Sequence, residues 1–282
     1  MADGTAIEWT HRPGTKGETL NPTTGCDRIS PGCTNCYALT MAARLKGMGS
    51  AKYQNDGDPE TSGPGFGLTV HPEVLDQIAR WGKPRTVFLN SMSDLWHDQV
   101  PDAFLEKTFD AMRDGPQHTF QVLTKRSHRM RRWVNAYYDC DHGGSLSASC
   151  SYCEPFPNVW LGVSVESDRY TFRARHLADT PAAVRFLSCE PLLGPLPSLD
   201  LSGIDWVIVG GESGPHARPL ELEWIDEIAE KTVAAGSRLF VKQLGTAWSL
   251  ANGHGRTHGG DWDLWPERLR VRQWPTLADV AA

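Results

Sequence analysis

The stretch that decides the fold is Val159-Trp-Leu-Gly-Val-Ser-Val165, followed by a helical pattern over residues 168–178 and then by Val184-Arg-Phe-Leu-Ser188. Both flanking runs are apolar at most positions, which is typical of parallel strands covered on both faces. The helical pattern between them is long enough to return the chain to the start of the next strand. This stretch therefore predicts a β-α-β unit and a parallel sheet.

The same alternation extends over most of the chain. Further apolar runs with strand character occupy residues 86–90, 119–124, 206–209 and 239–242. Helical patterns lie at residues 37–46, 71–80, 101–113, 127–137 and 222–235, the last followed by Gly236 as a C-terminal cap. Six strands alternating with helices predict an α/β fold of the partial (β/α)6-barrel type.

The domain organisation follows from these elements. Of the 282 residues, we expect 1–247 to form the barrel, with a cysteine-rich insertion at 138–156. Residues 248–282 would form a C-terminal extension, and the paired tryptophans of Trp262-Asp-Leu-Trp265 predict that it packs on the barrel. The oligomeric state is not indicated by the sequence.

Composition narrows the class of protein. Hydrophobic residues make up 40% and charged residues 22% of the chain, as in ordinary globular proteins. No apolar run approaches the roughly 18 residues of a membrane span, and the first residues lack the pattern of a signal peptide. We therefore expect a cytoplasmic protein without a membrane partner, in a bacterium or, if phage-encoded, in its host.

The charge pattern limits binding to nucleic acid. A net charge of −6 excludes attraction of the whole domain to a polyanion. One local basic run, Lys125-Arg-Ser-His-Arg-Met-Arg-Arg132, holds five Lys or Arg in eight residues. It is either a solvated helix face or a phosphate-binding surface in which Arg126, Arg129 and Arg132 contact nucleic acid.

Three cysteines near the start of the chain predict a metal site. Cys26, Cys33 and Cys36 have the spacing C-x6-C-x2-C in a loop rich in glycine and proline. A structural zinc site needs four ligands, and so does an ordinary iron–sulfur cluster. Three thiolates therefore leave one metal position open, unless a distant fourth ligand completes a zinc knuckle.

Polar residues stand at the end of almost every expected strand. In barrels of parallel strands, functional residues collect at the carboxyl ends, so we expect these side chains to line one mouth. Cys189, Glu190 and Glu212 are candidate catalytic residues there, and Arg218 is a candidate substrate contact. For Cys189 the alternative is a small buried apolar residue.

The sequence around the cysteines, from Asn21-Pro to Cys36-Tyr-Ala38, resembles the cluster loop of the radical S-adenosylmethionine superfamily. The usual spacing there is C-x3-C-x2-C, so the first gap is three residues longer here. The flanking residues resemble the branch that contains spore photoproduct lyase. The long gap is similar to a phage-associated family of uncharacterised proteins with a three-cysteine motif.

Downstream motifs extend this resemblance. Asn90-Ser-Met-Ser93-Asp94, Leu123-Thr-Lys125 and Gly162-Val-Ser164 follow in the order of matching motifs of that branch. The resemblance implies that Ser93, Asp94, Lys125 and Ser164 bind S-adenosylmethionine. It also implies a [4Fe-4S] cluster on the three cysteines, an electron donor, and formation of a 5′-deoxyadenosyl radical.

The resemblance suggests a nucleic-acid base or modified nucleotide as substrate. The photoproduct lyases use a cysteine near the Ser-Asp motif as hydrogen donor, and no thiol stands beside Ser93. The same terminal step is therefore not expected. The alternative is a zinc-stabilised nucleic-acid-binding protein without catalysis. A hydrolase using Glu212 or Ser213 is a third reading, although the run lacks the G-x-S-x-G spacing.

A second group of possible ligands lies between two expected strands. Cys140, His142, Cys150 and Cys153 form a complete four-ligand set with the chemistry that zinc prefers. The sequence around them is too poor in apolar residues to order itself, and a metal would supply that order. A structural zinc, an auxiliary iron–sulfur cluster and unligated thiols are the three alternatives.

Overall fold

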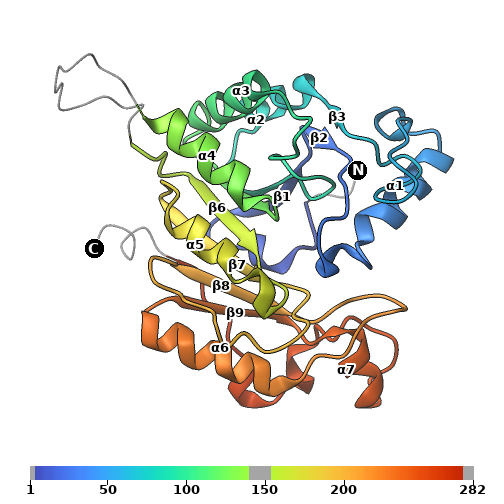
Figure 1. Cartoon of the computed structure of the whole chain (residues 1–282), viewed down its shortest axis with the longest axis vertical. Coiled ribbons are helices and arrows are strands. Elements are labelled where there is room, and N and C mark those ends of the chain that lie inside the picture. The colour runs from blue at the N-terminus through green and yellow to red at the C-terminus, as the bar shows by residue number, and fades with distance from the viewer. Residues whose placement is uncertain (1–3, 140–153, 276–282) are drawn as a thin grey trace.

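The computed structural model describes residues 4–139 and 154–275. Its centre is a curled sheet of seven parallel strands in the order β1-β4-β5-β6-β7-β8-β9 (Figure 1). The strands are β1 Lys16–Leu20, β4 Arg85–Leu89, β5 Thr119–Thr124, β6 Val159–Ser164, β7 Val184–Cys189, β8 Trp206–Gly210 and β9 Arg238–Gln243. The α/β partial barrel predicted from the sequence is confirmed, with one strand more than the expected six.

The additional strand β1 lies at the edge of the sheet and pairs only with β4. An edge strand is covered less completely than a central one, and β1 has the sequence Lys-Gly-Glu-Thr-Leu with two of its five residues buried. It therefore lacks the continuous apolar run by which the other strands were recognised.

Helices cover the outer side of the sheet. In Figure 1, α3, α4, α5 and α6 follow one another around that side, and α1 lies on the opposite side of the molecule from α4. The bounds are α1 Tyr37–Gly47, α2 Asp76–Arg80, α3 Asp102–Arg113, α4 Ser127–Tyr138, α5 Phe172–Ala178, α6 Leu222–Ala235 and α7 Gly245–Ala251. A short antiparallel pair, β2 Thr23–Thr24 and β3 Thr69–Val70, lies outside the main sheet.

Most helix predictions are confirmed, and two differ in length. Helix α6 has the predicted bounds, and Gly236 ends it in the left-handed conformation at φ 71°. The patterns over 71–80 and 168–178 each form a 3-10 turn followed by a shorter helix, α2 or α5. Between β7 and β8 the described chain runs without an α-helix.

The inner face of the sheet is filled by aromatic rings at one end. Trp9, Trp160, Phe186, Trp206 and Phe240 form a buried cluster on this face. The ring of Trp9 lies 4.6 Å from that of Phe88 on β4. We call this cluster the aromatic floor. Because the aromatic floor fills one end of the half-barrel, the cavity inside the described sheet opens at the other end, where the strands have their carboxyl termini.

The C-terminal extension runs along the far edge of the sheet. Val241 of β9 donates its N–H to the Val271 carbonyl at 2.8 Å, and Gln273 donates to the Leu239 carbonyl at 2.9 Å. Trp265 is 2% exposed and belongs to the main core. None of the described helices is long and apolar enough to cross a membrane.

Candidate functional site

The inward side chains change from aromatic to polar along each strand. On β6 they are Trp160, Gly162 and Ser164, and on β7 the inward Phe186 is followed by Ser188 and then by Glu190. A Cβ at Gly162 would lie 2.5 Å from the Phe186 ring, so only glycine fits there. The alternation of side chains along a strand thus places a polar wall above the aromatic floor.

A cavity of about 330 Å³ opens above this wall. It brings together the cysteine loop, residues 25–36, and the carboxyl ends of the strands. The predicted site residues that line it are Cys26, Cys33, Cys36, Ser93, Asp94, Lys125, Arg126, Ser164, Glu190 and Glu212. The predicted mouth therefore exists, and it collects these residues from across the chain.

The cysteine loop begins at a glycine that no other residue can replace without strain. Gly25 has a φ of 88°, and its N–H donates to the Met92 carbonyl at 3.1 Å. A Cβ at this position would lie 2.3 Å from the Gly67 carbonyl oxygen. The close approach of two backbones fixes the direction in which Cys26 leaves the sheet.

An ion pair holds the other end of the loop. Asn35 Nδ2 donates to Glu212 Oε2 at 3.0 Å, and Arg218 donates to the Pro31 carbonyl at 3.0 Å. Arg218 and Glu212 also bind each other through several hydrogen bonds. Burial raises the pKa of Glu212, but the hydrogen bonds from Arg218 and Asn35 outweigh it and hold that pKa below its ordinary value. This geometry gives Glu212 and Arg218 a positioning role on the cysteine loop.

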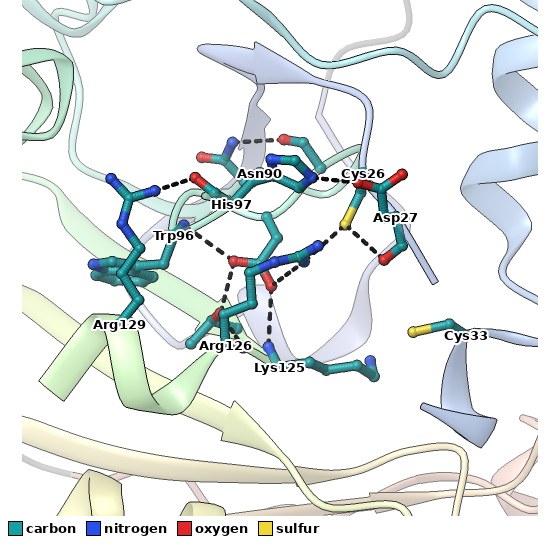
Figure 2. Close-up of polar contacts among 12 residues, drawn as sticks. Cys26, Asp27, Cys33, Asn90, Trp96, His97, Lys125, Arg126 and Arg129 are labelled. Atoms are coloured by element: carbon teal, nitrogen blue, oxygen red, sulfur yellow. Dashed lines mark hydrogen bonds and ion pairs between the residues drawn. The ribbon is translucent and has the colours of Figure 1, made fainter. Parts of the chain in front are cut away.

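A third contact fixes the middle of the loop. His97 Nε2 lies 2.8 Å from Asp27 Oδ2, and the hydroxyls of Thr61 and Ser62 donate to the other carboxylate oxygen. Burial opposes ionisation, but these contacts keep the pKa of Asp27 below its ordinary value. Figure 2 shows this pair directly beside Cys26.

Ser93 takes part in a hydroxyl network under the same loop. Its Oγ donates to the Thr23 carbonyl at 2.8 Å and accepts from Asn90 Nδ2 at 2.6 Å. Asn90 has a φ of 65°, a left-handed conformation that asparagine tolerates better than most residues. Sequence reasoning missed Thr23 as a site residue and gave Asn90 no role, although its position at a strand end was visible.

The carboxylate of Asp94 accepts hydrogen bonds from several groups of the protein. It accepts from Thr124 Oγ1 at 2.6 Å, from the Lys125 N–H at 3.1 Å and from the Trp96 N–H at 3.1 Å. Arg126 also approaches it at 3.4 Å. Asp94 lines the cavity, but these contacts assign it to fixing the end of β5 beneath the site.

Lys125 and Ser164, two of the predicted cofactor-binding residues, contact each other in the cavity. Lys125 Nζ donates to Ser164 Oγ at 3.2 Å. Within residues 4–139 and 154–275, no carboxylate pairs with this ammonium. A lysine without an acidic partner beside three thiols is suited to bind an anionic group of a ligand.

Arg126 points in a different direction from its neighbour. Its Nη1 donates to Cys26 Sγ at 3.2 Å while the guanidinium also contacts Asp94 (Figure 2). Burial, with the charge of Asp94, raises the pKa of the Cys26 thiol to about 12, and Arg126 opposes that shift.

The arginines of the basic run differ in their contacts. Arg129 donates to the carbonyls of His97 and Val100 and to Asp102 at 2.7 Å. The Arg126 side chain turns toward Cys26. Of the three arginines predicted to contact nucleic acid, Arg132 is therefore the exposed one. Arg126 and Arg129 are thus directed to different neighbours within the protein, and contact of the three arginines with nucleic acid stays a prediction.

Cys189 lies on the wrong face for catalysis. Its side chain is fully buried in the core under the helices, and it does not line the cavity. Burial, with the nearby Glu166, raises the pKa of this thiol to about 12. The prediction of a catalytic Cys189 is therefore corrected: Ser188 and Glu190 face inward, and the residue between them faces outward.

A buried ion pair that sequence reasoning missed supports Ser164. Arg173 Nη1 donates to Glu166 Oε2 at 2.8 Å and to the Ser164 carbonyl at 2.9 Å. Glu166 also faces Gly32, where an added Cβ would come within 3.2 Å of its carboxyl carbon. Neither residue belongs to a recognisable motif, and their pairing depends on the turn after β6.

The three thiols of the cysteine loop face the same cavity. Among the described residues, no three His, Cys, Asp or Glu side chains converge around one metal position. Thiolates are ligands both of zinc and of iron–sulfur clusters, so Cys26, Cys33 and Cys36 have the chemistry that either metal group needs. The second predicted group, Cys140, His142, Cys150 and Cys153, lies outside the described residues.

A family model described as "Protein of unknown function (DUF5131)" matches residues 4–266. The chain belongs to this family. No curated protein matches the chain. Among solved structures, this chain is similar to spore photoproduct lyase.

The similarity to the lyase is distant. One single mutant of the lyase is 14% identical with a TM-score of 0.45, covering 82% of this chain and 77% of that one. A double mutant with bound AdoMet and dinucleoside spore photoproduct is 14% identical with a TM-score of 0.40. That match includes 81% of the DUF5131 chain and 65% of the lyase chain. The DUF5131 chain therefore spans less than two thirds of the length of that lyase.

Proposed function

We propose that this DUF5131 protein is a radical S-adenosylmethionine enzyme. Cys26, Cys33 and Cys36 would hold a [4Fe-4S] cluster, and Lys125 with Ser164 would bind S-adenosylmethionine. The observation that carries the proposal is that one cavity is lined by three thiols and by the Lys125 ammonium, which has no acidic partner among the described residues. That cavity lies at the carboxyl ends of a curled parallel sheet, where such barrels place their functional residues.

Each part of the site suits this role. The Lys125 ammonium can donate charge-assisted hydrogen bonds to the carboxylate of S-adenosylmethionine, with Ser164 holding its direction. A [4Fe-4S] cluster held by the three cysteines would supply the one electron that breaks the C5′–S bond of S-adenosylmethionine, with methionine as the leaving group and a 5′-deoxyadenosyl radical as the other product. The contacts around the cysteine loop position these groups, and the aromatic floor excludes water from below.

The opposite side of the cavity supports a substrate contact. Lys242 Nζ donates to Glu190 Oε1 at 2.7 Å, and both residues line the cavity. Burial lowers the pKa of Lys242, but the Glu190 carboxylate outweighs it and raises that pKa, so the Lys242 ammonium keeps its charge at neutral pH. A donor beside an acceptor suits the edge of a nucleobase. We extend the proposal to a nucleotide or nucleic-acid base, as the motifs shared with the photoproduct lyase branch suggest.

Anaerobic reconstitution with iron and sulfide tests the proposal. The purified full chain should take up iron and sulfide, and reduction with dithionite in the presence of S-adenosylmethionine should release 5′-deoxyadenosine. A Cys33→Ala variant treated in parallel should yield neither. Stoichiometric zinc at the three cysteines, with no uptake of iron, would contradict the proposal and favour a zinc-stabilised binding protein.

A further inference from the structure

Two consecutive residues at the end of β5 act on different parts of the site. Lys125 reaches Ser164, whereas Arg126 turns back toward the cysteine loop. The turn is fixed by the backbone, because the Arg126 N–H donates to Thr124 Oγ1 at 2.8 Å. The Arg126 side chain is only 10% exposed. Its position is therefore set by the fold rather than by solvent.

The guanidinium is held against one sulfur. Arg126 Nη1 lies 3.2 Å from Cys26 Sγ and 3.4 Å from Asp94 Oδ2. Asp94 is itself anchored by Thr124 and by the Lys125 N–H, so it fixes the arginine in turn. Figure 2 shows the Arg126 guanidinium directed toward the Cys26 sulfur. An arginine in proteins keeps its proton, so this donor is always charged.

The other two thiols have different surroundings. Cys33 Sγ lies 3.8 Å from the neutral Ser30 hydroxyl. In the described parts of the chain, no guanidinium donates to Cys33 or Cys36. The three cysteines of the site are therefore not equivalent, and the difference is a buried guanidinium donor that is paired with Asp94.

We propose that Arg126 is a positioning residue that raises the reduction potential of the cluster through its hydrogen bond to Cys26 Sγ. The inference rests on the proposed function. Reduction adds negative charge to the cluster and its thiolates. A charged donor at one sulfur stabilises this reduced state more than the oxidised one, and burial limits screening by water.

Potentiometric titration of the reconstituted cluster, followed by electron paramagnetic resonance, tests this assignment. Arg126→Gln should keep the cluster iron but shift its midpoint potential to a lower value. Arg126→Lys keeps the positive charge but loses the forked donors of the guanidinium. Its midpoint potential should therefore lie between those of wild type and Arg126→Gln. Arg132→Gln is the matched control, since it removes the same charge from an exposed position on α4, the helix that begins directly after Arg126.

The outcomes separate the two proposals. A midpoint of Arg126→Gln equal to that of Arg132→Gln, with normal iron content, would overturn the role of Arg126 alone. If Arg126→Gln fails to fold or to hold iron, the Arg126→Lys variant is used in its place. A midpoint potential of Arg126→Lys equal to that of Arg132→Gln would then overturn the role of Arg126. A wild-type chain without iron would instead contradict the proposed function.

Discussion

The two sides of the cavity differ in how their polar groups are used. On the side of the cysteine loop, Asp27, Asp94 and Glu212 are each held by several donors of the protein itself. On the side of β7 and β9, Glu190 accepts from Lys242 and from Gln243 through one oxygen, Oε1, and both Glu190 and Lys242 line the cavity. The first side is fixed in advance, which would suit a cofactor site. On the second side the contacts of Glu190 use one carboxylate oxygen, which would leave the other for a substrate.

The largest effect is expected at the cysteines. Cys33→Ala should lose nearly all cluster iron, because each thiolate of the set binds a separate iron. The temperature of thermal unfolding should stay close to that of wild type, since Asn35 and Arg218 hold the loop without the metal. Iron analysis and circular dichroism measure both quantities. Global unfolding of this variant would show that the site is structural.

Lys125 should control cofactor affinity. Lys125→Met removes a charge-assisted hydrogen bond worth about 1.5–3 kcal/mol, so the Kd for S-adenosylmethionine should rise about 10- to 100-fold. Isothermal titration of the reconstituted protein measures this change. Ser164→Ala should have a smaller effect, because it removes only the neutral hydroxyl that orients the lysine. Unchanged binding by Lys125→Met would place the cofactor elsewhere.

Glu212 should make stability depend on pH. Its pKa is lowered in the folded state, so its contribution is present above the ordinary value of 4.5 and is lost as pH falls through the lower folded value. Glu212→Gln should therefore cost about 1–3 kcal/mol at pH 7, and the difference from wild type should shrink below pH 4.5.

Denaturant unfolding across this pH range provides the measurement for Glu212. The exposed Glu230→Gln on α6 is a suitable control and should unfold like wild type at every pH. If the free energies of unfolding of Glu212→Gln and wild type differed by the same amount at pH 7 and below pH 4.5, Glu212 would not be ionised in the folded protein.

The smallest effect is expected at Cys189. Because its side chain lies in the core behind the wall of the cavity, Cys189→Ala should cost about 1 kcal/mol of stability. Iron content and release of 5′-deoxyadenosine should match wild type. If Cys189→Ala kept its iron but released no 5′-deoxyadenosine, the catalytic role of Cys189 would be supported after all.

The sequence predicted the central sheet because strands buried on both faces leave a continuous apolar run. It missed β1, whose edge position permits Lys16 and Glu18. Cys189 was misplaced by one residue, although the inward Ser188 and Glu190 on either side determine that it faces outward. The hydrogen-bond partners of the site residues could not be predicted from the sequence, because they are far apart along the chain. Cys26 and Arg126 are 100 residues apart, and Asn35 and Glu212 are 177 apart.

The most direct test of the central claim is the electron paramagnetic resonance spectrum of the reduced, reconstituted protein with and without S-adenosylmethionine. Three cysteines leave one iron free, and that iron should face Lys125 and Ser164 across the cavity. Addition of S-adenosylmethionine should therefore change the cluster spectrum, and Lys125→Met should require a higher concentration for the same change. An iron–sulfur spectrum that S-adenosylmethionine leaves unaltered would contradict the account.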